Sequence, residues 1–492
     1  MIEIKNSLKP QDLSAKLERL WALSGEKIKS IEKGWDAAQG SPVFTIKGKY
    51  TSKGWTEWTQ GFVYGSALLQ YDATNDASFL EIGRNHTFKD MAGHITHMGV
   101  HDHGFNNVST YGNLWRLIGE GRFQADGREK DFYELALKCS GAVQAMRWTP
   151  INNGKGYIHS FNGPHSLFAD TIRSLRALAL SHKLGHTLLG EKDAKINLLQ
   201  RLVDHAAVTA EFTLFYGEGR DSYDVPALRG RAAHEIIFNT TDGSYRCPNS
   251  QQGYAPFTTW TRGLAWVMLG YAEELEFLAT LSDKELDTVG GRKPVEAMML
   301  KAAKASCDFY ISQTPKDGIP YWDTGAPNLH KLDNYLDKPA DPFNEHEPVD
   351  SSAAAIASQG LLRLGRLLRA RGADAKSGAD AKSGADAKSG ADAKSGADAK
   401  SGETTEGERY WQAGLTVVDR LFEEPYLSTD PAHQGLLLHS VYHRPNGWDY
   451  IPPGAKVPLG ESSQWGDYHA REVALYLNRI LKNEKYFAFY GV

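Results

Sequence analysis

The residues with the clearest chemical potential lie in segment 94–107, HITHMGVHDHGFNN, where four histidines crowd around Asp102. Histidine is the commonest metal ligand, so a metal site is one interpretation. The spacing is not HExxH, and no carboxylate stands in an i, i+4 relation to these histidines, so we expect no metal. Two interpretations remain: a polar loop of buried, hydrogen-bonded histidines, or a site in which Asp102 supplies a carboxylate beside Phe105, Asn106 and Asn107.

A second acidic residue, Asp170, lies where a Gly-Pro loop enters a helical pattern in segment 160–182. The helix dipole favours an aspartate near a helix N-terminus, which is a purely structural explanation. Leu167, Phe168 and Ile172 surround this aspartate with apolar groups, however. Because an apolar pocket raises the pKa of a carboxyl group, Asp170 is a candidate general acid.

Segment 251–275 places Trp260, Arg262 and Trp266 at or near the start of one helical pattern. An arginine between two tryptophans can clamp a carboxylate while the indole rings stack on a sugar. Alternatively, the tryptophans belong to the core and the arginine caps a neighbouring carbonyl group.

Four later segments combine polar and aromatic residues just before patterns typical of helices. In segment 348–358, small residues such as Ala353 to Ala355 allow helices to approach closely. The segments are 320–325 (PYWDTG), 348–358 (PVDSSAAAIAS), 436–450 (LLHSVYHRPNGWDY) and 460–472 (GESSQWGDYHARE), the last containing Ser462 and Ser463.

Helical periodicity dominates the chain, and only residues 44–51 indicate a short strand. The predicted helices cover residues 10–31, 59–73, 77–95, 105–119, 128–146, 167–184, 192–216, 258–280, 293–313, 350–370, 407–422 and 464–482. Helices in hairpin succession predict an all-α fold, an (α/α)6 barrel formed by residues 1–492 as one catalytic domain. An open α-solenoid is the alternative, but the helical segments show no fixed repeat.

The hexamer GADAKS occurs five times in tandem between residues 372 and 401. It has no aromatic or β-branched residue with which to bury a core, and its regular glycines oppose a helix. We therefore interpret residues 372–402 as a low-complexity surface insertion between two barrel helices, with no part in catalysis.

Composition excludes several classes of partner. The net charge is -5, and no block of lysine or arginine provides a footprint for nucleic acid. No stretch approaches the ~20 apolar residues that a membrane span requires. The three cysteines lack CxxC spacing, and the N-terminal segment lacks the pattern of a signal peptide, so we expect a cytoplasmic protein.

Taken together, the motifs resemble those of the unsaturated glucuronyl hydrolases of glycoside hydrolase family 88. HDHGF is similar to the family's HDxGF, and FADTIRSLRAL resembles the segment that carries the family's second aspartate. QGY followed by WTRGLAW is close to the family's QGY and WARGQAW, and the segment from Trp58 resembles the family's early WxxGF. The YWD, DSSAAAIAS and WGDY motifs follow in the family's order, so the resemblance covers most of the chain.

The resemblance implies an (α/α)6 barrel that hydrates the double bond of a 4,5-unsaturated uronic acid at the non-reducing end of lyase products. Asp170 would protonate C4 and help water add at C5, and Asp102 would hold the sugar and orient Asp170. Trp58 would stack on the sugar. Gln252, Trp260, Arg262 and Trp266 would line the substrate site, and no cofactor would be required.

Three departures from the family pattern indicate a divergent member. Arg173 stands three residues after Asp170, where it could pair with that carboxyl and lower its pKa, or bind a carboxylate or sulfate of the substrate. Arg246 and Cys247 stand where the family has a histidine, and HDHGF continues with polar residues. We expect a more polar pocket and an extra-anionic substrate, with Arg173, Arg246, Ser462 and Ser463 as further substrate-binding residues.

Other functions remain open on the sequence. An unsaturated rhamnogalacturonyl hydrolase would share the fold and the chemistry, and a conventional glucuronidase would act on saturated substrates. A carbohydrate-binding protein on the same fold is the alternative without catalysis. The expected partner is an unsaturated uronic-acid oligosaccharide, and the chain is expected to be a monomer or a homodimer.

Overall fold

The computed structural model describes the chain except for residues 55–57, 383–391 and 491–492 and the side chains of residues 373–404. Helices account for most of the described residues. They are α1 (Ser14–Gly34), α2 (Gln60–Thr74), α3 (Ala77–Asp90), α4 (Ala92–Ile95), α5 (His103–Asn107), α6 (Asn113–Gly119), α7 (Gly127–Met146), α8 (Thr171–Ser174), α9 (Arg176–Lys183), α10 (Leu198–Val208), α11 (Thr261–Leu278), α12 (Asp283–Asp287), α13 (Arg292–Gln313), α14 (Ser351–Lys382), α15 (Asp392–Leu421) and α16 (Gln464–Leu481).

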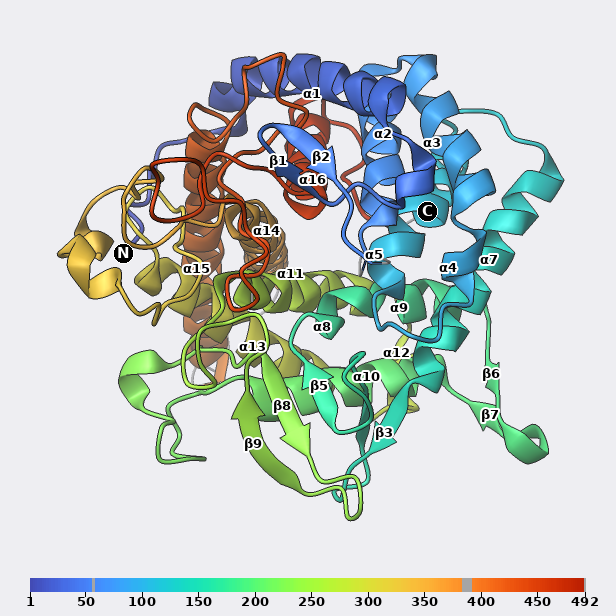
Figure 1. Cartoon of the computed structure of the whole chain (residues 1–492). Coiled ribbons are helices and arrows are strands. Elements are labelled where there is room, and N and C mark those ends of the chain that lie inside the picture. The colour runs from blue at the N-terminus through green and yellow to red at the C-terminus, as the bar shows by residue number, and fades with distance from the viewer. Residues whose placement is uncertain (55–57, 383–391, 491–492) are drawn as a thin grey trace.

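The helices form two concentric layers, as Figure 1 shows. The inner segments contact one another in a closed ring that runs α2, α5, α8 with α9, α11, α14, α16 and back to α2. Each inner segment also contacts an outer helix: α3, α7, α10, α13, α15 and α1, respectively. The first five outer helices follow their inner partners along the chain, whereas α1 near the N-terminus packs on α16 near the C-terminus. Six such pairs make an (α/α)6 barrel, and the predicted all-α fold is confirmed.

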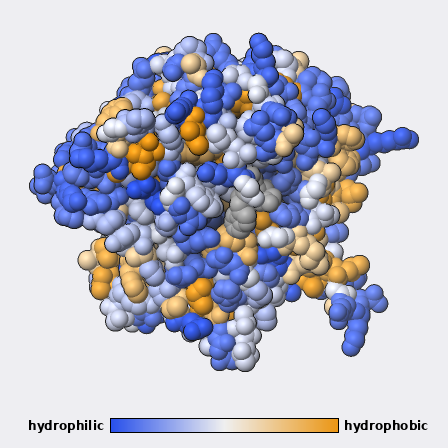
Figure 2. Space-filling model, in the orientation of Figure 1, coloured by the Kyte–Doolittle hydropathy of each residue, from blue (hydrophilic) through white to orange (hydrophobic). Residues whose placement is uncertain are grey.

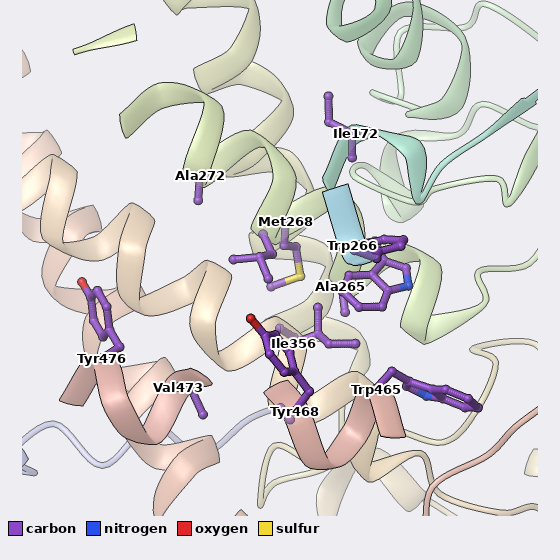
Figure 3. Close-up of a cluster of buried hydrophobic side chains, with 14 of the residues drawn as sticks. Ile172, Ala265, Trp266, Met268, Ala272, Ile356, Trp465, Tyr468, Val473 and Tyr476 are labelled. Atoms are coloured by element: carbon purple, nitrogen blue, oxygen red, sulfur yellow. The ribbon is translucent and has the colours of Figure 1, made fainter. Parts of the chain in front are cut away.

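Burial explains which helices are inner. Every residue of α11 is buried, as expected for a helix that is surrounded on all sides, whereas α1 buries one face only. The inner layer meets in a core where Ala265, Trp266 and Met268 of α11 lie near Trp465 and Tyr468 of α16 (Figure 3). By contrast, the face of the molecule in Figure 2 is mostly hydrophilic, with scattered apolar patches.

Glycine allows the inner helices to approach closely at the end that will hold the candidate site. A Cβ atom on Gly104 of α5 would lie 2.2 Å from the carbonyl oxygen of Ser174 in α8. A Cβ atom on Gly270 of α11 would lie 2.7 Å from Ile172, also in α8. Any larger residue at these positions would push α8 away from its neighbours.

The short strands lie in loops at the edge of the barrel and form small antiparallel sheets. They are β1 (Phe44–Ile46) with β2 (Lys49–Thr51), β3 (Trp148–Pro150) with β4 (Gly156–Ile158), β6 (Leu188–Leu189) with β7 (Lys195–Ile196), and a sheet ordered β5 (Ser166–Phe168), β8 (Glu235–Phe238), β9 (Tyr245–Asn249). The strand predicted at 44–51 is the hairpin in which Phe44 pairs with Thr51.

Two details differ from the predicted elements. The helix predicted over 167–184 is wrong at its start, because Leu167 and Phe168 belong to β5, which pairs with β8. The helix predicted over 105–119 contains a π-helical turn at Val108–Gly112 between α5 and α6. Such a turn re-aims the side chains on either side of it, and here it follows directly on the Asp102 segment.

Helices extend into the GADAKS repeat from both sides. α14 continues to Lys382 and α15 starts at Asp392, so the repeat's glycines do not prevent a helix there. Residues 383–391 of the predicted insertion lie outside the described part of the chain. The interpretation of residues 372–402 as a surface insertion that takes no part in catalysis stays a prediction.

No helix in the described part of the chain has both the length and the apolar character needed to cross a membrane. The same residues contain no group of three or more histidine, cysteine, aspartate or glutamate side chains arranged to hold a metal ion.

Candidate active site

A pocket opens at the barrel end where inner helices α2, α5, α8 and α11 begin. About 650 Å³ of space free of protein atoms lies within its walls and at its mouth, a volume that includes open solvent. Its wall combines carboxyl groups, imidazoles and aromatic rings. The lining residues are Trp58, Val100, His101, Asp102, Phe105, Phe161, Asp170, Gln251, Gln252, Trp260, Arg262, Trp266, Tyr442, His443 and Trp448.

The two predicted aspartates meet in this pocket on either side of one imidazole. Asp102 precedes α5 and Asp170 precedes α8, and both side chains are more than nine-tenths buried. His101 Nε2 lies 3.1 Å from Asp170 Oδ1 and 3.6 Å from Asp102 Oδ1. The close approach of α5 and α8 at Gly104 therefore brings the two carboxyl groups together.

The electrostatics of Asp170 differ from the expectation. Burial alone would raise the pKa of its carboxyl, as the apolar neighbours predicted. The hydrogen bond from His101 and the charges of His101 and Arg262 outweigh burial, so the pKa lies below its ordinary value. The predicted raised pKa is wrong for the free protein, because the sequence pattern does not show that an imidazole touches this carboxyl.

His101 shows the opposite balance. Burial lowers the pKa of its imidazole, but the charge of Asp102 and the hydrogen bond and charge of Asp170 raise it above its ordinary value. The two carboxylates therefore favour the protonated form of the His101 imidazole. This interpretation adds a third residue to the two that the sequence analysis named as catalytic.

A second histidine, His234 directly before β8, has its tautomer set by the backbone. Its Nδ1 accepts hydrogen bonds from the N–H groups of Gln251 and Gln252, at 3.0 and 3.1 Å. The proton of the neutral ring therefore sits on Nε2. Burial lowers the pKa of this histidine to about 3, so it stays neutral beside Asp170.

Aromatic rings form the walls of the pocket, as the predicted role in sugar stacking requires. Trp58 stacks on Trp465 with ring centres 4.9 Å apart and also contacts Phe105 edge-on. Trp266 packs against Phe105 with ring centres 4.8 Å apart. On the other side, Trp448 packs on His443 at 4.9 Å. These contacts hold the rings in place before any ligand arrives.

Arg262 reaches the pocket, but protein acceptors surround its guanidinium. It lies between the rings of Trp260 and Trp465, at 4.6 and 5.0 Å, rather than between Trp260 and Trp266. Its Nη1 donates to Asp350 at 2.9 Å and to the Val441 carbonyl.

The second guanidinium nitrogen of Arg262 is occupied in the same way. Nη2 donates to Gln252 Oε1 at 3.1 Å and to the Tyr442 carbonyl at 2.7 Å. These bonds tie α11 to residues 441–442, of which Tyr442 lines the pocket, and the carboxylate clamp at Arg262 stays a prediction.

Four other predicted substrate-binding residues lie away from the pocket. Arg173 is fully buried and pairs with Glu273 and Glu472, each at 2.9 Å, instead of pairing with Asp170. Its guanidinium points into the core, where its positive charge compensates the two buried carboxylates. Arg246 is exposed on β9.

Ser462 and Ser463 shape the start of α16 instead of lining the pocket. Ser462 donates to Asp467 Oδ1 at 2.8 Å, and the hydroxyl of Ser463 accepts from the Gly466 N–H as the helix cap. The structure thus corrects the predicted positions of Arg173, Arg246, Ser462 and Ser463.

Several pocket residues were not singled out from the sequence. His101 directly precedes Asp102 in the motif, and this adjacency was the available signal. Tyr442, His443 and Trp448 lie in a quoted segment whose polar and aromatic composition was noted, but no residue in it could be chosen. Phe161 and Gln251 carried no signal of their own.

The fold and the pocket define the class of protein: an (α/α)6 barrel with paired carboxyl groups and an aromatic wall at one end. No protein-family model matches the chain. An unsaturated glucuronyl hydrolase of Formosa agariphila is 23% identical over 310 residues, which is 63% of each chain. The chain spans just under two thirds of that relative.

A longer match is to the unsaturated glucuronyl hydrolase of Bacillus sp. strain GL1, 22% identical over 88% of this chain and 89% of that protein. Its crystal structure superposes with a TM-score of 0.63 over 96% of this chain and 98% of that chain, at 19% identity. A glucuronyl hydrolase structure described as specific for heparin gives a TM-score of 0.65 over 95% and 98%, at 18% identity. The resemblance predicted from the motifs is confirmed, and the low identity makes this chain a divergent relative.

Proposed function

We propose that this protein is a glycoside hydrolase that removes a 4,5-unsaturated uronic acid from the non-reducing end of oligosaccharides produced by polysaccharide lyases. One observation carries the proposal: Asp102 and Asp170 flank a single buried imidazole in a pocket walled by aromatic rings. The names of the relatives, unsaturated glucuronyl hydrolase and unsaturated chondroitin disaccharide hydrolase, point to the same substrate class.

The reaction is the hydration of an enol ether. Asp170, as a carboxylic acid, protonates C4 of the double bond, and the positive charge that develops at C5 is shared with the ring oxygen. Water adds at C5 and returns a proton to the Asp170 carboxylate. The hemiketal that forms collapses, the ring opens, and the aglycone leaves. This sequence uses no metal or organic cofactor.

The remaining pocket residues bind and orient the sugar. Trp58 and Trp266 offer ring faces for stacking, and Asp102 accepts hydrogen bonds from sugar hydroxyls. Gln252 is held by Arg262, which fixes the side of the pocket formed by residues 441–442. We propose that the substrate's anionic character matters, because His101 supplies positive charge within the pocket.

We further propose a cytoplasmic location, which the free cysteines Cys139, Cys247 and Cys307 support because reducing compartments keep thiols unpaired. Its substrates would then be imported saccharides already shortened by lyases. The association state, a monomer or a homodimer, stays a prediction that sedimentation can decide.

The proposal is tested by following the ultraviolet absorbance of the conjugated enol acid. The panel contains unsaturated disaccharides from heparin, chondroitin and hyaluronan, an unsaturated rhamnogalacturonan disaccharide, and saturated glucuronides. We expect the wild-type protein to remove the absorbance of at least one unsaturated member and Asp170→Asn to remove none. Asp204→Asn on the outer helix α10 is the matched control and should keep full activity.

The panel also separates the alternatives. Turnover confined to the rhamnogalacturonan disaccharide would mean that the protein acts on pectin-derived substrates, still by hydration of the double bond. Turnover of saturated glucuronides without a double bond would replace hydration by conventional hydrolysis. Binding without any turnover would leave a carbohydrate-binding protein and would end the proposal.

A further inference from the structure

His101 is the residue in this pocket whose position the proposed reaction does not yet explain. Its side chain is 1% exposed, and its Nε2 is placed between Asp170 at 3.1 Å and Asp102 at 3.6 Å. The ring is held edge-on by Phe168 at 5.5 Å, and Phe161 lies 6.0 Å away. A buried imidazole fixed against both carboxyl groups is placed to exchange a proton with them.

We propose that His101 stores the proton that Asp170 delivers to C4 of the substrate, so that the acid of the reaction is the His101–Asp170 pair and not Asp170 alone. This inference rests on the proposed function for its chemical context, but the proton pair itself exists in the free protein. The assignment makes His101 a third catalytic residue, with Asp102 as the anion that keeps it charged.

A stored proton is needed because the free protein holds Asp170 as a carboxylate. His101 lowers the pKa of this carboxyl despite burial, and a carboxylate cannot protonate an alkene. The same contact raises the pKa of His101. The two opposite shifts therefore place the shared proton of the pair on the nitrogen of His101 rather than on the oxygen of Asp170.

Among the histidines of this cluster, His101 is the one that holds this proton. Besides the two aspartates, the charged or titratable groups that face it are Arg147 after α7, His159 after β4, His205 of α10 and His234 before β8. Burial lowers the pKa to about 4 for His159 and about 3 for His205 and for His234. Arg147 opposes the charge on His101, but the two carboxylates outweigh it.

The proton moves in balanced steps. The Nε2–H bond of His101 breaks as the O–H bond of Asp170 forms, which leaves a neutral imidazole beside a carboxylic acid. That O–H bond then breaks while the π electrons of the double bond form the C4–H bond. Water adds at C5, its proton passes to the Asp170 carboxylate and back to His101, and the pair is restored.

The pair can be tested without any substrate by following the 15N signals of the histidine side chains through a pH titration. We expect His101 of the free wild-type protein to titrate above ~6.5, the ordinary histidine value. In Asp170→Asn the midpoint should fall, because the hydrogen bond to a charged partner and half of the negative charge are lost. A neutral His101 at pH ~6, or a midpoint that Asp170→Asn leaves unchanged, would overturn the inference.

Kinetics then test the catalytic role with His101→Gln. In the plot of kcat against pH, the fall on the alkaline side should move to lower pH by about one unit or more. The reason is that Asp170 must then be protonated without a proton from His101. At pH ~7.5 kcat should fall at least about 10²-fold, and much less at pH ~5. His103→Gln is the matched control, since His103 is equally buried but bonds Ser140 and the His97 carbonyl.

The outcomes are distinct. An equal loss of kcat at every pH in His101→Gln, with the limb unmoved, means a structural role and refutes the inference. If the wild-type protein turns over no saccharide, the proposed function fails, while the titration still decides whether His101 and Asp170 share a proton. If His101→Gln does not fold, the Asp170→Asn titration alone carries the decision.

Discussion

Arg262 and Asp350 form a buried ion pair, with 2.9 Å between Nη1 and Oδ2, which joins α11 to the start of α14 directly behind the pocket. Asp350 itself does not line the pocket. The sequence left two alternative roles for Arg262: a clamp for the substrate's carboxylate or a support for the protein. A variant of Asp350 can distinguish them, because it affects Arg262 without removing a pocket residue.

Asp350→Asn should distinguish these roles. Removing one partner of a buried pair is expected to destabilise the fold by about 3–5 kcal/mol. If Arg262 is a support for the protein, the loop at 441–442 also shifts, and KM for the unsaturated disaccharide should rise several-fold. The control is Glu276→Gln, which breaks the buried Arg363–Glu276 pair on another part of the core. It should cost similar stability in urea unfolding but leave KM unchanged.

Trp58 should contribute to substrate binding through its ring face. Trp58→Ala is expected to raise KM by about tenfold, since an aromatic contact contributes roughly 0.5–1.5 kcal/mol beyond the area it buries. Trp58→Phe should recover part of the loss, because a smaller ring still stacks. Steady-state kinetics on the best substrate of the panel provide the measurement. A KM that is equal in all three proteins would remove Trp58 from the binding site.

Gly104 should tolerate no side chain. A methyl group there meets the Ser174 carbonyl oxygen at 2.2 Å, so Gly104→Ala must displace α5 from α8 and separate Asp102 from Asp170. We expect a loss of about 1–3 kcal/mol in unfolding free energy and a large fall in kcat. Gly127→Ala is the control, because nothing lies within 4 Å of its added Cβ. It should be neutral or slightly stabilising in its helix.

The buried charges of the barrel core should make the fold sensitive to acid. Arg173 and Arg176 hold the pKa of Glu472 far below its ordinary value of 4.5, despite the burial that would raise it. A carboxylate with a depressed pKa stabilises the fold above pH ~4.5, and this stabilisation is lost progressively as the pH falls below that value.

The measurement is the free energy of unfolding in urea as a function of pH. The wild-type protein should lose stability steeply below pH ~4.5, and Glu472→Gln should be less stable at pH 7 but show a shallower loss in acid. Parallel curves for the two proteins would mean that Glu472 does not carry the acid sensitivity.

Much of the candidate site was predictable because its residues lie in compact motifs. Asp102, Asp170, Gln252, Trp260 and Trp266 each sit at or near the start of a helical pattern, and the starts of the inner helices share one end of a barrel. The resemblance of these motifs to the glucuronyl hydrolase pattern implied that the residues serve one site, but only the structure brings Asp102 and Asp170 together. The histidine next to Asp102 was visible too, but its partner was not.

The residues whose positions were predicted wrongly from the sequence were misjudged for one physical reason. Arg173 was expected near Asp170 because positions three apart share a helix face, but the carboxylates of Glu273 and Glu472 lie on other helices and bind it first. Arg262 was expected to face the substrate, but its acceptors Asp350, Val441 and Tyr442 are far away in sequence.

The sequence by itself determined the helical periodicity, the all-α fold class and the residue types available for chemistry, because these depend on local spacing. Only the tertiary structure decided which charges meet. A buried ionic group takes whichever partner the packing supplies, and the energy of that choice is set by contacts between distant segments. This is why the carboxyl of Asp170, expected to be a free acid in an apolar pocket, is instead paired with the imidazole of His101.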